Sequence, residues 1–396
     1  MGARHRSSPM NRYPSIFYYT SIANFFFFLG NSMFILLPVY LKHLGAAEAY
    51  IGFMGNMDKI FMVVAAVVLG SFLRQHDRIK LLRWGYGFLL ITYCLYLPLS
   101  SLSWYLPLIR IAHGVGFSIA MIVGSTIIFE NVLPERATEA IGVYGITGSI
   151  SNAISPAIGE FLLHEGYPFQ MLFLFSVCCL AVSLVIALRM PCTKSRASDA
   201  PCPSSGSLRL MHNRDFIRYG LVSLIFGGGF GVLVTFLPNF IRTCTSLNYS
   251  LFFIVYIAVL IVIRLMFLNM ITRWNKVLLL KGVLMIGACM NILITALDSL
   301  LLLLIISIMY GITHGVLYPV LNALVVNAAP QQQRGRANAL FSALFNGGML
   351  VFACCAGFLV DVFHTYSAAF VLCAVAFCAG CLFVAAPQHS PAPTTS

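Results

Sequence analysis

Residues 299–327 read SLLLLLIISIMYGITHGVLYPVLNALVVN, and this stretch decides the class of fold. It continues for 29 residues without an Asp, Glu, Lys or Arg. An α-helix that crosses the hydrocarbon core of a membrane needs about 20 mostly apolar residues. The stretch meets that requirement, and its unbroken apolar character excludes the short alternating strands of a membrane β-barrel.

Eleven further runs of comparable length and polarity occur along the chain. We therefore expect an all-α membrane protein with twelve transmembrane helices. These helices are expected at residues 16–41, 50–73, 81–102, 104–130, 138–163, 168–188, 216–241, 249–271, 277–297, 299–327, 336–363 and 366–386.

The composition agrees with a protein that lipid covers. Hydrophobic residues make up 60% of the 396 residues and charged residues only 9%. Soluble proteins carry about 25% charged residues because their surface must face water. This composition excludes a soluble globular protein and a disordered chain. A nucleic-acid-binding module is excluded as well, although the net charge is +12.

The basic residues predict how the chain is oriented, since Lys and Arg collect in cytoplasmic loops. With the N-terminus inside, 19 of the 24 basic residues fall on the cytoplasmic side. Only Lys42 and Arg242 fall on the opposite side. We therefore expect both termini in the cytoplasm, which requires an even number of spans.

A polar break near the middle of the chain indicates two halves. It is rich in Ser, Pro and Cys, and it predicts a six-helix half at 1–189, a cytoplasmic linker at 190–214 and a second half at 215–396. Two short echoes support a duplication. Leu-Pro recurs at 37–38 and 237–238, and His-Gly-Val recurs at 113–115 and 314–316. Transporters use such repeats, and a chance match is the alternative.

Several short motifs lie where one transporter family carries its own. Residues 110–116, RIAHGVG, resemble Arg-x-x-Gln-Gly-x-Gly, and residues 70–80, GSFLRQHDRIK, resemble Gly-x-Leu-x-Asp-Arg-x-Gly-Arg-Lys with Arg74 in place of the acid. Residues 155–160, SPAIGE, are similar to the Gly-Pro-x-x-Gly-Gly of antiporters. From the first span to the last, the chain resembles the major facilitator superfamily.

This resemblance implies two halves that rock about a central cavity lined by spans one, four, seven and ten. At matching positions the resemblance nominates as solute-binding residues Asn24, Asn31, Arg110, His113, Phe230 and Asn239. As gating residues it nominates Gly70, Arg74, Arg78, Pro156, Arg264 and Arg273. Because Arg74 stands where the family motif has an Asp, the role of that Asp in gating does not carry over to this chain. For Arg264 the alternative to gating is a side chain that extends to the membrane interface.

Charged residues inside spans point to a coupling device. A charge at the bilayer centre costs about 2.5–3.5 kcal/mol on insertion scales, and such residues are mostly functional. Asp58 and Arg110 lie at similar depth in their spans, so we expect them to interact and Asp58 to carry a coupling proton. The alternative is a structural pair between Asp58 and Lys59. Glu160 is a further candidate for proton coupling.

Four polar residues in span ten recur every four positions, so they share one helix face. They are Tyr310, His314, Tyr318 and Asn322, and we predict that they bind solute in the central cavity. Hydrogen bonding between helices is the alternative. The glycines at 227–229 and 347–348 are expected to permit close helix packing.

The sequence offers no metal-binding cluster, phosphate-binding loop or nucleophile elbow, so we expect neither a cofactor nor enzymatic activity. We expect a monomeric secondary transporter of the plasma membrane (the inner membrane in a Gram-negative cell). It would move a small organic solute, coupled to protons and in the efflux direction. Uptake by symport or uniport, lipid flipping, and a nontransporting membrane sensor are the alternatives. No nucleic acid is expected as a partner.

Overall fold

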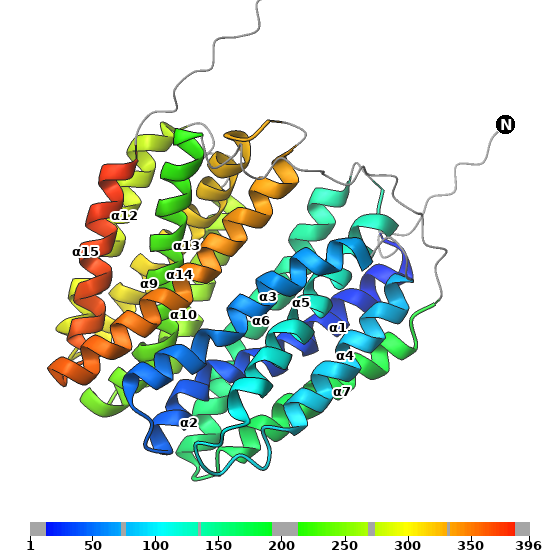
Figure 1. The fold of residues 1–396 in the computed structure, drawn as a ribbon, viewed down its shortest axis with the longest axis horizontal. Coiled ribbons are helices and arrows are strands. Elements are labelled where there is room, and N and C mark those ends of the chain that lie inside the picture. The colour runs from blue at the N-terminus through cyan, green and yellow to red at the C-terminus, as the bar shows by residue number, and fades with distance from the viewer. Residues whose placement is uncertain are drawn as a thin grey trace, which may run out of the picture. The chain divides into compact units, whose positions relative to one another are not determined.

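The computed structural model describes residues 13–72, 77–133, 136–191, 213–267, 274–330 and 333–384, and within these ranges it contains helices and no strand (Figure 1). The helices of the N-terminal part are α1 (Ser15–Ser32), α2 (Leu37–His43), α3 (Glu48–Phe72), α4 (Arg78–Cys94), α5 (Leu106–Asn131), α6 (Ala137–His164) and α7 (Gln170–Leu188). A short 3₁₀ segment, η1 (Met33–Leu36), joins α1 to α2. The C-terminal helices are α9 (Arg214–Cys244), α10 (Tyr249–Val262), α12 (Lys276–Thr295), α13 (Leu300–Asn327), α14 (Arg334–Phe363) and α15 (Ser367–Phe383), with the π-helical turn η3 (Ile263–Phe267) after α10.

The membrane fold expected from the sequence is confirmed. Eight helical stretches of the described ranges are long and apolar enough to cross a membrane, and each falls on an expected span. The apolar helix Ser367–Phe383 is shorter and falls on the last expected span. The total of twelve spans and the cytoplasmic position of both termini stay predictions.

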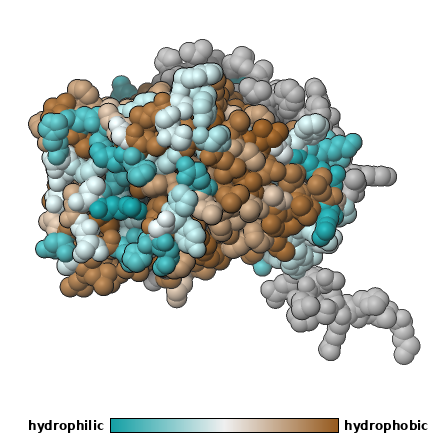
Figure 2. Space-filling view, turned by 90° about the horizontal axis from the view of Figure 1, so that it is seen from below, coloured by the Kyte–Doolittle hydropathy of each residue, from teal (hydrophilic) through white to brown (hydrophobic). Residues whose placement is uncertain are grey.

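Large apolar side chains cover much of the surface, as a membrane protein requires. Trp104 and Leu382 are 81% and 85% exposed. Figure 2 shows continuous apolar surface with hydrophilic residues gathered in patches. Such an extent of exposed apolar surface marks contact with lipid rather than with water.

By internal contacts the chain divides into two compact units. The first comprises Met1–Phe34 and Val64–Asp199, and the second comprises Ile35–Val63 and Ala200–Ser396. Residues 35–63 therefore pack with the C-terminal helices, although they precede most of the first unit in sequence. The expected six-helix halves at 1–189 and 215–396, and the duplication that would relate them, stay predictions. Most of the expected linker at 190–214 lies outside the described residues.

Local sequence signals explain where several helices begin. Asp77, Asn213 and Asn275 precede α4, α9 and α12, and each side chain accepts hydrogen bonds from the first backbone amides of its helix. Ser299 does the same for α13. These residue types are the preferred N-caps, because their short oxygen-bearing side chains satisfy amides that lack an intrahelical partner.

In the first unit, α1 packs against α5, α6 and α7, and α4 packs against α5 and α7. In the second unit, α9 packs against α14 and α15, while α12 packs on α13 and α15 (Figure 1). Glycines bring α9 and α14 close together. A Cβ atom at Gly227 would lie 2.0 Å from the Phe345 carbonyl oxygen, and one at Gly348 would lie 2.0 Å from that of Leu224. The expected close packing is thus confirmed at 227–229 and at Gly348, whereas a Cβ atom at Gly347 would meet no heavy atom within 4 Å.

Candidate functional site

A buried polar cluster in the first unit centres on His113 of α5. The His113 Nε2 atom lies 3.0 Å from the Asn31 Oδ1 atom, and the Nδ1 atom lies 3.3 Å from the Tyr96 Oη atom. Tyr93 Oη donates to the same Asn31 Oδ1 at 3.0 Å. The ring of Phe34 packs against the imidazole, with centroids 4.6 Å apart. Two sequence-predicted solute residues, Asn31 and His113, are therefore in direct contact.

The hydrogen bonds of this cluster assign the imidazole tautomer. An amide oxygen only accepts hydrogen bonds, so His113 Nε2 must carry the hydrogen that it donates to Asn31. His113 Nδ1 then accepts from Tyr96 in the neutral ring. Both ring nitrogens are therefore occupied by partners from the protein, and His113 is only 2% exposed.

The remaining predicted residues of the first unit are also buried. Asn24 of α1 donates through Nδ2 to the Thr147 Oγ1 atom at 2.9 Å and to the Tyr144 carbonyl oxygen at 3.3 Å. It therefore ties α1 to α6. Arg110 lies one turn before His113 on α5 and is 2% exposed. A guanidinium at this depth is costly, because burial removes its hydration.

In the second unit, the predicted stripe on α13 is present as a row of neighbouring rings. The centroids of Tyr310 and His314 are 6.0 Å apart in a T-shaped arrangement, and those of His314 and Tyr318 are also 6.0 Å apart with tilted planes. Phe230 of α9 contacts this ring row, with its centroid 5.0 Å from that of His314. The spacing of four residues thus places these side chains together, as the sequence indicated.

His314 differs from His113 in how its ring nitrogens are used. Its Nδ1 atom lies 2.9 Å from the Tyr256 Oη atom of α10, and the ring meets the faces of Phe226 and Phe230 edge-on. Either partner can donate in this pair, so the hydrogen bond is compatible with both neutral tautomers of His314. The Nε2 atom, which donates or accepts according to the tautomer, has no hydrogen-bond partner in the described part of the chain, and His314 is 8% exposed. It is therefore a polar atom with an unused hydrogen-bonding position inside an aromatic cluster.

Two predicted residues further along α13 contact neighbouring helices. The guanidinium carbon of Arg264 lies 5.9 Å from the centroid of the Tyr318 ring, which is within reach of a cation–π contact. Asn322 donates through Nδ2 to the Asn338 Oδ1 atom of α14 at 2.9 Å. Arg264 thus lies beside the α13 ring row, and Asn322 links α13 to α14.

The predicted coupling residue Asp58 is 5% exposed in α3. Its Oδ2 atom accepts a hydrogen bond from Lys59 Nζ at 2.7 Å, which is the structural pairing that the sequence left open. Arg110 belongs to the other compact unit, so an Asp58–Arg110 contact stays a prediction. Glu160 is half-buried in α6.

The predicted gating residues are separated in the structure. Arg78, at the start of α4, donates from Nε and Nη2 to the Glu130 Oε1 atom of α5 at 3.2 and 3.1 Å. Pro156 is buried inside α6, and Gly70 lies in the last turns of α3. Arg74 and Arg273 lie outside the described residues.

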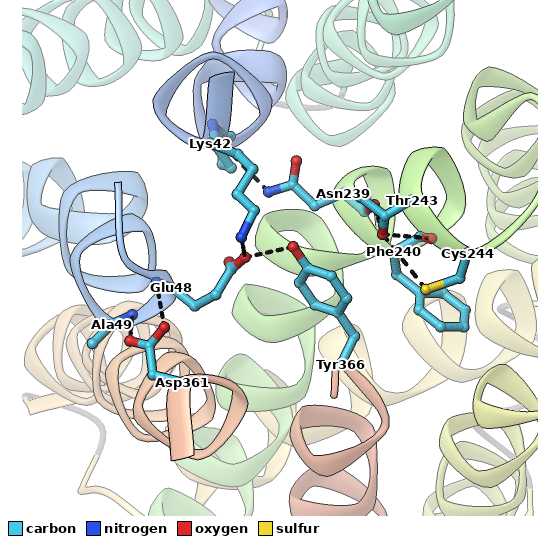
Figure 3. A network of polar contacts seen from close by, with 10 residues as sticks. Lys42, Glu48, Ala49, Asn239, Phe240, Thr243, Cys244, Asp361 and Tyr366 are labelled. Carbon is cyan, nitrogen blue, oxygen red and sulfur yellow. Dashed lines mark hydrogen bonds and ion pairs between the residues drawn. The ribbon is translucent and has the colours of Figure 1, made fainter. Parts of the chain in front are cut away.

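Asn239 of α9 contacts α2 rather than the rings of α13. It is 2% exposed, and its Nδ2 atom donates to the Pro38 carbonyl oxygen of α2 at 3.3 Å (Figure 3). One turn deeper on the same helix, the Thr235 Oγ1 atom accepts from Asn56 Nδ2 of α3 at 2.9 Å. These two bonds fasten α2 and α3 to α9. Asn239 therefore links α9 to α2 by a hydrogen bond.

Sequence reasoning missed the partners of the two histidines and of Arg78. Tyr96, Tyr256 and Glu130 each lie on a different element from the residue that they contact, and no periodicity links them. Glu130 ends an apolar run, and nothing in the sequence points to Arg78 as its partner. Asp361 of α14 was missed for the same reason; its carboxylate accepts hydrogen bonds from the first two backbone amides of α3 at 2.9 and 2.8 Å (Figure 3). Among the residues that the structure describes, no group of three His, Cys, Asp or Glu side chains could hold a metal ion.

Comparison with known protein families identifies the family of this chain. A family model described as Major Facilitator Superfamily matches residues 20–297 and 220–396. No curated protein matches the chain by sequence.

Solved structures share the whole fold at low sequence identity. The human organic anion transporter MFSD10 (TETRAN) is 16% identical with a TM-score of 0.65, over 96% of this chain and 100% of that chain. The nucleoside transporter NupG is 14% identical with a TM-score of 0.78, over 93% and 98% of the two chains. The peptide transporter POT in complex with sulfate is 12% identical with a TM-score of 0.78, over 94% of each chain.

Proposed function

Because the chain belongs to the major facilitator superfamily, we propose that it is a secondary active transporter that moves a small organic solute by alternating access. Membrane transport itself follows from the family, and the fold is that of a transporter rather than an enzyme. The proposal concerns three further points, which are the class of the solute, the direction of transport and the coupling ion.

The observation that carries the proposal is the environment of His314. Its Nε2 atom has no protein partner among the described residues, and the aromatic rings of Phe226, Phe230 and Tyr318 surround the imidazole. An apolar pocket with a few fixed polar groups is the usual form of a small-molecule site. A solute with a hydrogen-bonding oxygen or nitrogen beside an apolar or aromatic body fits these surroundings.

The buried Arg110 favours a solute that is polar or anionic on one side. A guanidinium binds carboxylate and phosphate groups through paired hydrogen bonds. Among the similar structures, one protein is called an organic anion transporter, one a nucleoside transporter and one a peptide transporter. We therefore place organic anions and nucleosides first among the solutes to test.

Proton coupling is proposed for the buried acid Asp58. Burial favours the protonated form of a carboxyl group, while an adjacent cation such as Lys59 favours the ionised form. A carboxyl group between these two influences can load and release a proton as access alternates. Efflux rests on the antiporter-like residues 155–160 alone, and uptake is the alternative direction.

The test is ligand-induced thermal stabilisation of the detergent-purified protein. The panel contains sugars, amino acids, organic anions, nucleosides, cationic drugs and lipids. A ligand at 100 times its dissociation constant stabilises the folded state by about 2.7 kcal/mol. We expect an organic anion or nucleoside to raise the melting temperature.

Variants locate the site. The shift is expected to disappear in both Arg110→Ala and His314→Ala and to persist in Arg242→Ala, which removes an exposed guanidinium at the end of α9. A shift that survives in both site variants would contradict the residue assignment. A response to lipids alone would favour a flippase, and a folded protein that responds to no solute would favour a nontransporting sensor.

A further inference from the structure

A groove lies where η3, α12 and α13 meet in the second compact unit. Both η3 and α12 pack against α13. Ile263 lines the groove from η3, Ile312 and Val316 line it from α13, and a stripe between Asn275 and Ile286 lines it from α12. The groove has a volume of about 580 Å³, which is the size of a small-molecule site. It is formed entirely within one unit.

The sequence of α12 shapes the longest side of this groove. Its lining residues recur at intervals of three and four positions, so they share one helix face. They are Asn275, Leu278, Leu279, Gly282, Val283 and Ile286. Gly282 is exposed, and a Cβ atom there would meet no heavy atom within 4 Å. The missing side chain therefore leaves room in the middle of an apolar stripe.

The groove lies on a different face of α13 from the ring row. Ile312 and Val316 are each two residues from His314, which corresponds to about 200° around an α-helix. They are therefore directed away from the imidazole. At the edge of the groove, Leu278 is 73% exposed and Trp274 is exposed as well. Large apolar side chains exposed on a transmembrane protein contact lipid, so the groove opens toward the membrane and not toward the solute residues.

Polar side-chain atoms occur at only one end of the groove. Among its described lining residues, only Trp274 and Asn275 carry such atoms, and both directly precede α12. Lys276, the first residue of α12, is exposed next to them. A solute with polar groups along its length would leave them without hydrogen bonds here, which is costly. The groove instead suits an amphipathic molecule with an anionic group near Lys276 and a long apolar tail.

The length of the groove identifies its occupant. From Asn275 to Ile286 the helix rises about 16 Å. Half of the hydrocarbon core of a bilayer is about 15 Å thick. Trp274 marks the polar end as the membrane interface, where Trp is enriched. In the topology predicted from the basic residues this end is cytoplasmic, and anionic lipids give that leaflet its negative potential. The groove therefore spans the depth of one leaflet.

We propose that this groove binds one acyl chain of an anionic glycerophospholipid from the cytoplasmic leaflet, with Lys276 beside the phosphate and Gly282 making room for the chain. An acyl chain gains little hydrophobic stabilisation by entering the groove, since the surrounding lipid is equally apolar. Preference among lipids therefore comes from the charge of Lys276, and the groove holds the head group within its reach. This site goes beyond the proposed transport function and does not depend on it.

Trp274 provides the reporter for the test. The chain has three Trp residues, and the other two, Trp84 and Trp104, are replaced by Phe. The single-Trp protein is reconstituted into vesicles of phosphatidylcholine and phosphatidylglycerol. Bromine atoms are placed on the acyl chains of one lipid or of the other, and they quench the indole fluorescence on contact. The two quenching curves give the relative affinity of the two lipids beside Trp274.

The parent protein is expected to prefer phosphatidylglycerol about fivefold, which is the effect of one Lys near an anionic surface. Lys276→Gln should abolish this preference, and so should Gly282→Leu, because the new side chain fills the groove. Lys281→Gln should keep it, since Lys281 lies on the side of α12 that contacts α15. Gly142→Leu, at an exposed glycine of α6 whose Cβ also meets no atom within 4 Å, should keep it too.

Three results would overturn the proposal. They are equal affinities for the two lipids in the parent, a preference that survives Gly282→Leu, and a preference lost in Lys281→Gln. The second would show that Lys276 attracts head groups without the groove, and the third that the overall charge of α12 decides. Melting temperatures establish folding, and Ile312→Phe, which narrows the groove from α13, replaces Gly282→Leu if that variant does not fold. The test uses no solute and no ion gradient, so its failure leaves the transport proposal intact.

Discussion

Two neighbouring glycines of α14 provide a sharp test of the helix packing. A Cβ atom added at Gly348 would lie 2.0 Å from the Leu224 carbonyl oxygen and 2.9 Å from its carbonyl carbon. A Cβ atom at Gly347 would meet no heavy atom within 4 Å. The perturbation is therefore Gly348→Ala, and Gly347→Ala is its control at the adjacent position of the same helix.

The expected magnitudes follow from two opposing effects. Replacing Gly by Ala inside a helix stabilises by about 0.5–1 kcal/mol, because Ala loses less backbone entropy on folding. Both variants gain this amount. Overpacking a tight core costs about 1–3 kcal/mol, and here only Gly348→Ala meets a backbone that must shift. The two variants should therefore differ in stability by about 1–3 kcal/mol.

The assay is thermal unfolding of the purified variants in one detergent. For a unit of about 200 residues, 1 kcal/mol corresponds to about 2–4 °C in Tm. We expect Gly347→Ala to melt at or above the parent and Gly348→Ala to melt about 2–12 °C below Gly347→Ala. Gly227→Ala, on the facing helix, should behave like Gly348→Ala because its Cβ meets the Phe345 carbonyl oxygen. Melting temperatures of the two α14 variants within about 1 °C of each other would refute the reasoning.

Three further predictions concern buried polar pairs and proton coupling. Tyr256→Phe removes the phenol hydroxyl that pairs with the buried His314 Nδ1 atom and should destabilise by about 1–3 kcal/mol, measured as a lower Tm. Glu130→Ala removes the carboxylate that accepts two hydrogen bonds from the buried Arg78, and a loss of about 1–3 kcal/mol is expected in the same assay. Asp58→Asn cannot exchange a proton, so initial transport rates in proteoliposomes should lose their dependence on the proton gradient; an unchanged dependence would contradict the coupling role.

Much of the fold could be predicted because length and polarity decide whether a segment crosses a membrane. The expected span at 299–327 corresponds to α13 at Leu300–Asn327, and that at 50–73 corresponds to α3 at Glu48–Phe72. The first span was expected to be continuous over 16–41. It is instead interrupted by η1, which ends directly before the helix that holds Pro38 near its N-terminus. A hydropathy pattern does not register such a change of helical pitch.

The candidate site could be predicted only as far as one helix at a time. Residues four apart on α13 share a face by geometry, so the ring row from Tyr310 to Tyr318 could be predicted from the sequence. Which helix packs against that row depends on long-range contacts, so Tyr256 could not be predicted. The cap that Asp361 provides for α3 had one available signal, the absence of a capping side chain before Glu48. Nothing in the sequence indicated that the missing acceptor would come from a residue more than 300 positions away.

The two histidines show how a repeated motif can acquire different roles. His-Gly-Val recurs 201 residues apart, and in both places the imidazole is buried on its helix with Nδ1 at a tyrosine hydroxyl. The tyrosines come from unlike elements, since Tyr96 follows α4, whereas Tyr256 lies in α10, which immediately precedes α12. The two histidines therefore pair with tyrosines at positions that do not correspond between the expected halves. Burying a ring nitrogen without a hydrogen-bond partner is costly, and a different tyrosine supplies the partner in each case.

The second ring nitrogen then separates the two roles. In the first unit Asn31 occupies the Nε2–H group of His113, so that side chain holds α1 to α5 and has no donor left for a solute. In the second unit no described residue forms a hydrogen bond with the Nε2 atom of His314. Replacing Asn31 by Leu should therefore lower stability, whereas replacing His314 should lower solute binding more than stability. The residue that tests the transport proposal is the histidine whose hydrogen bonding is incomplete.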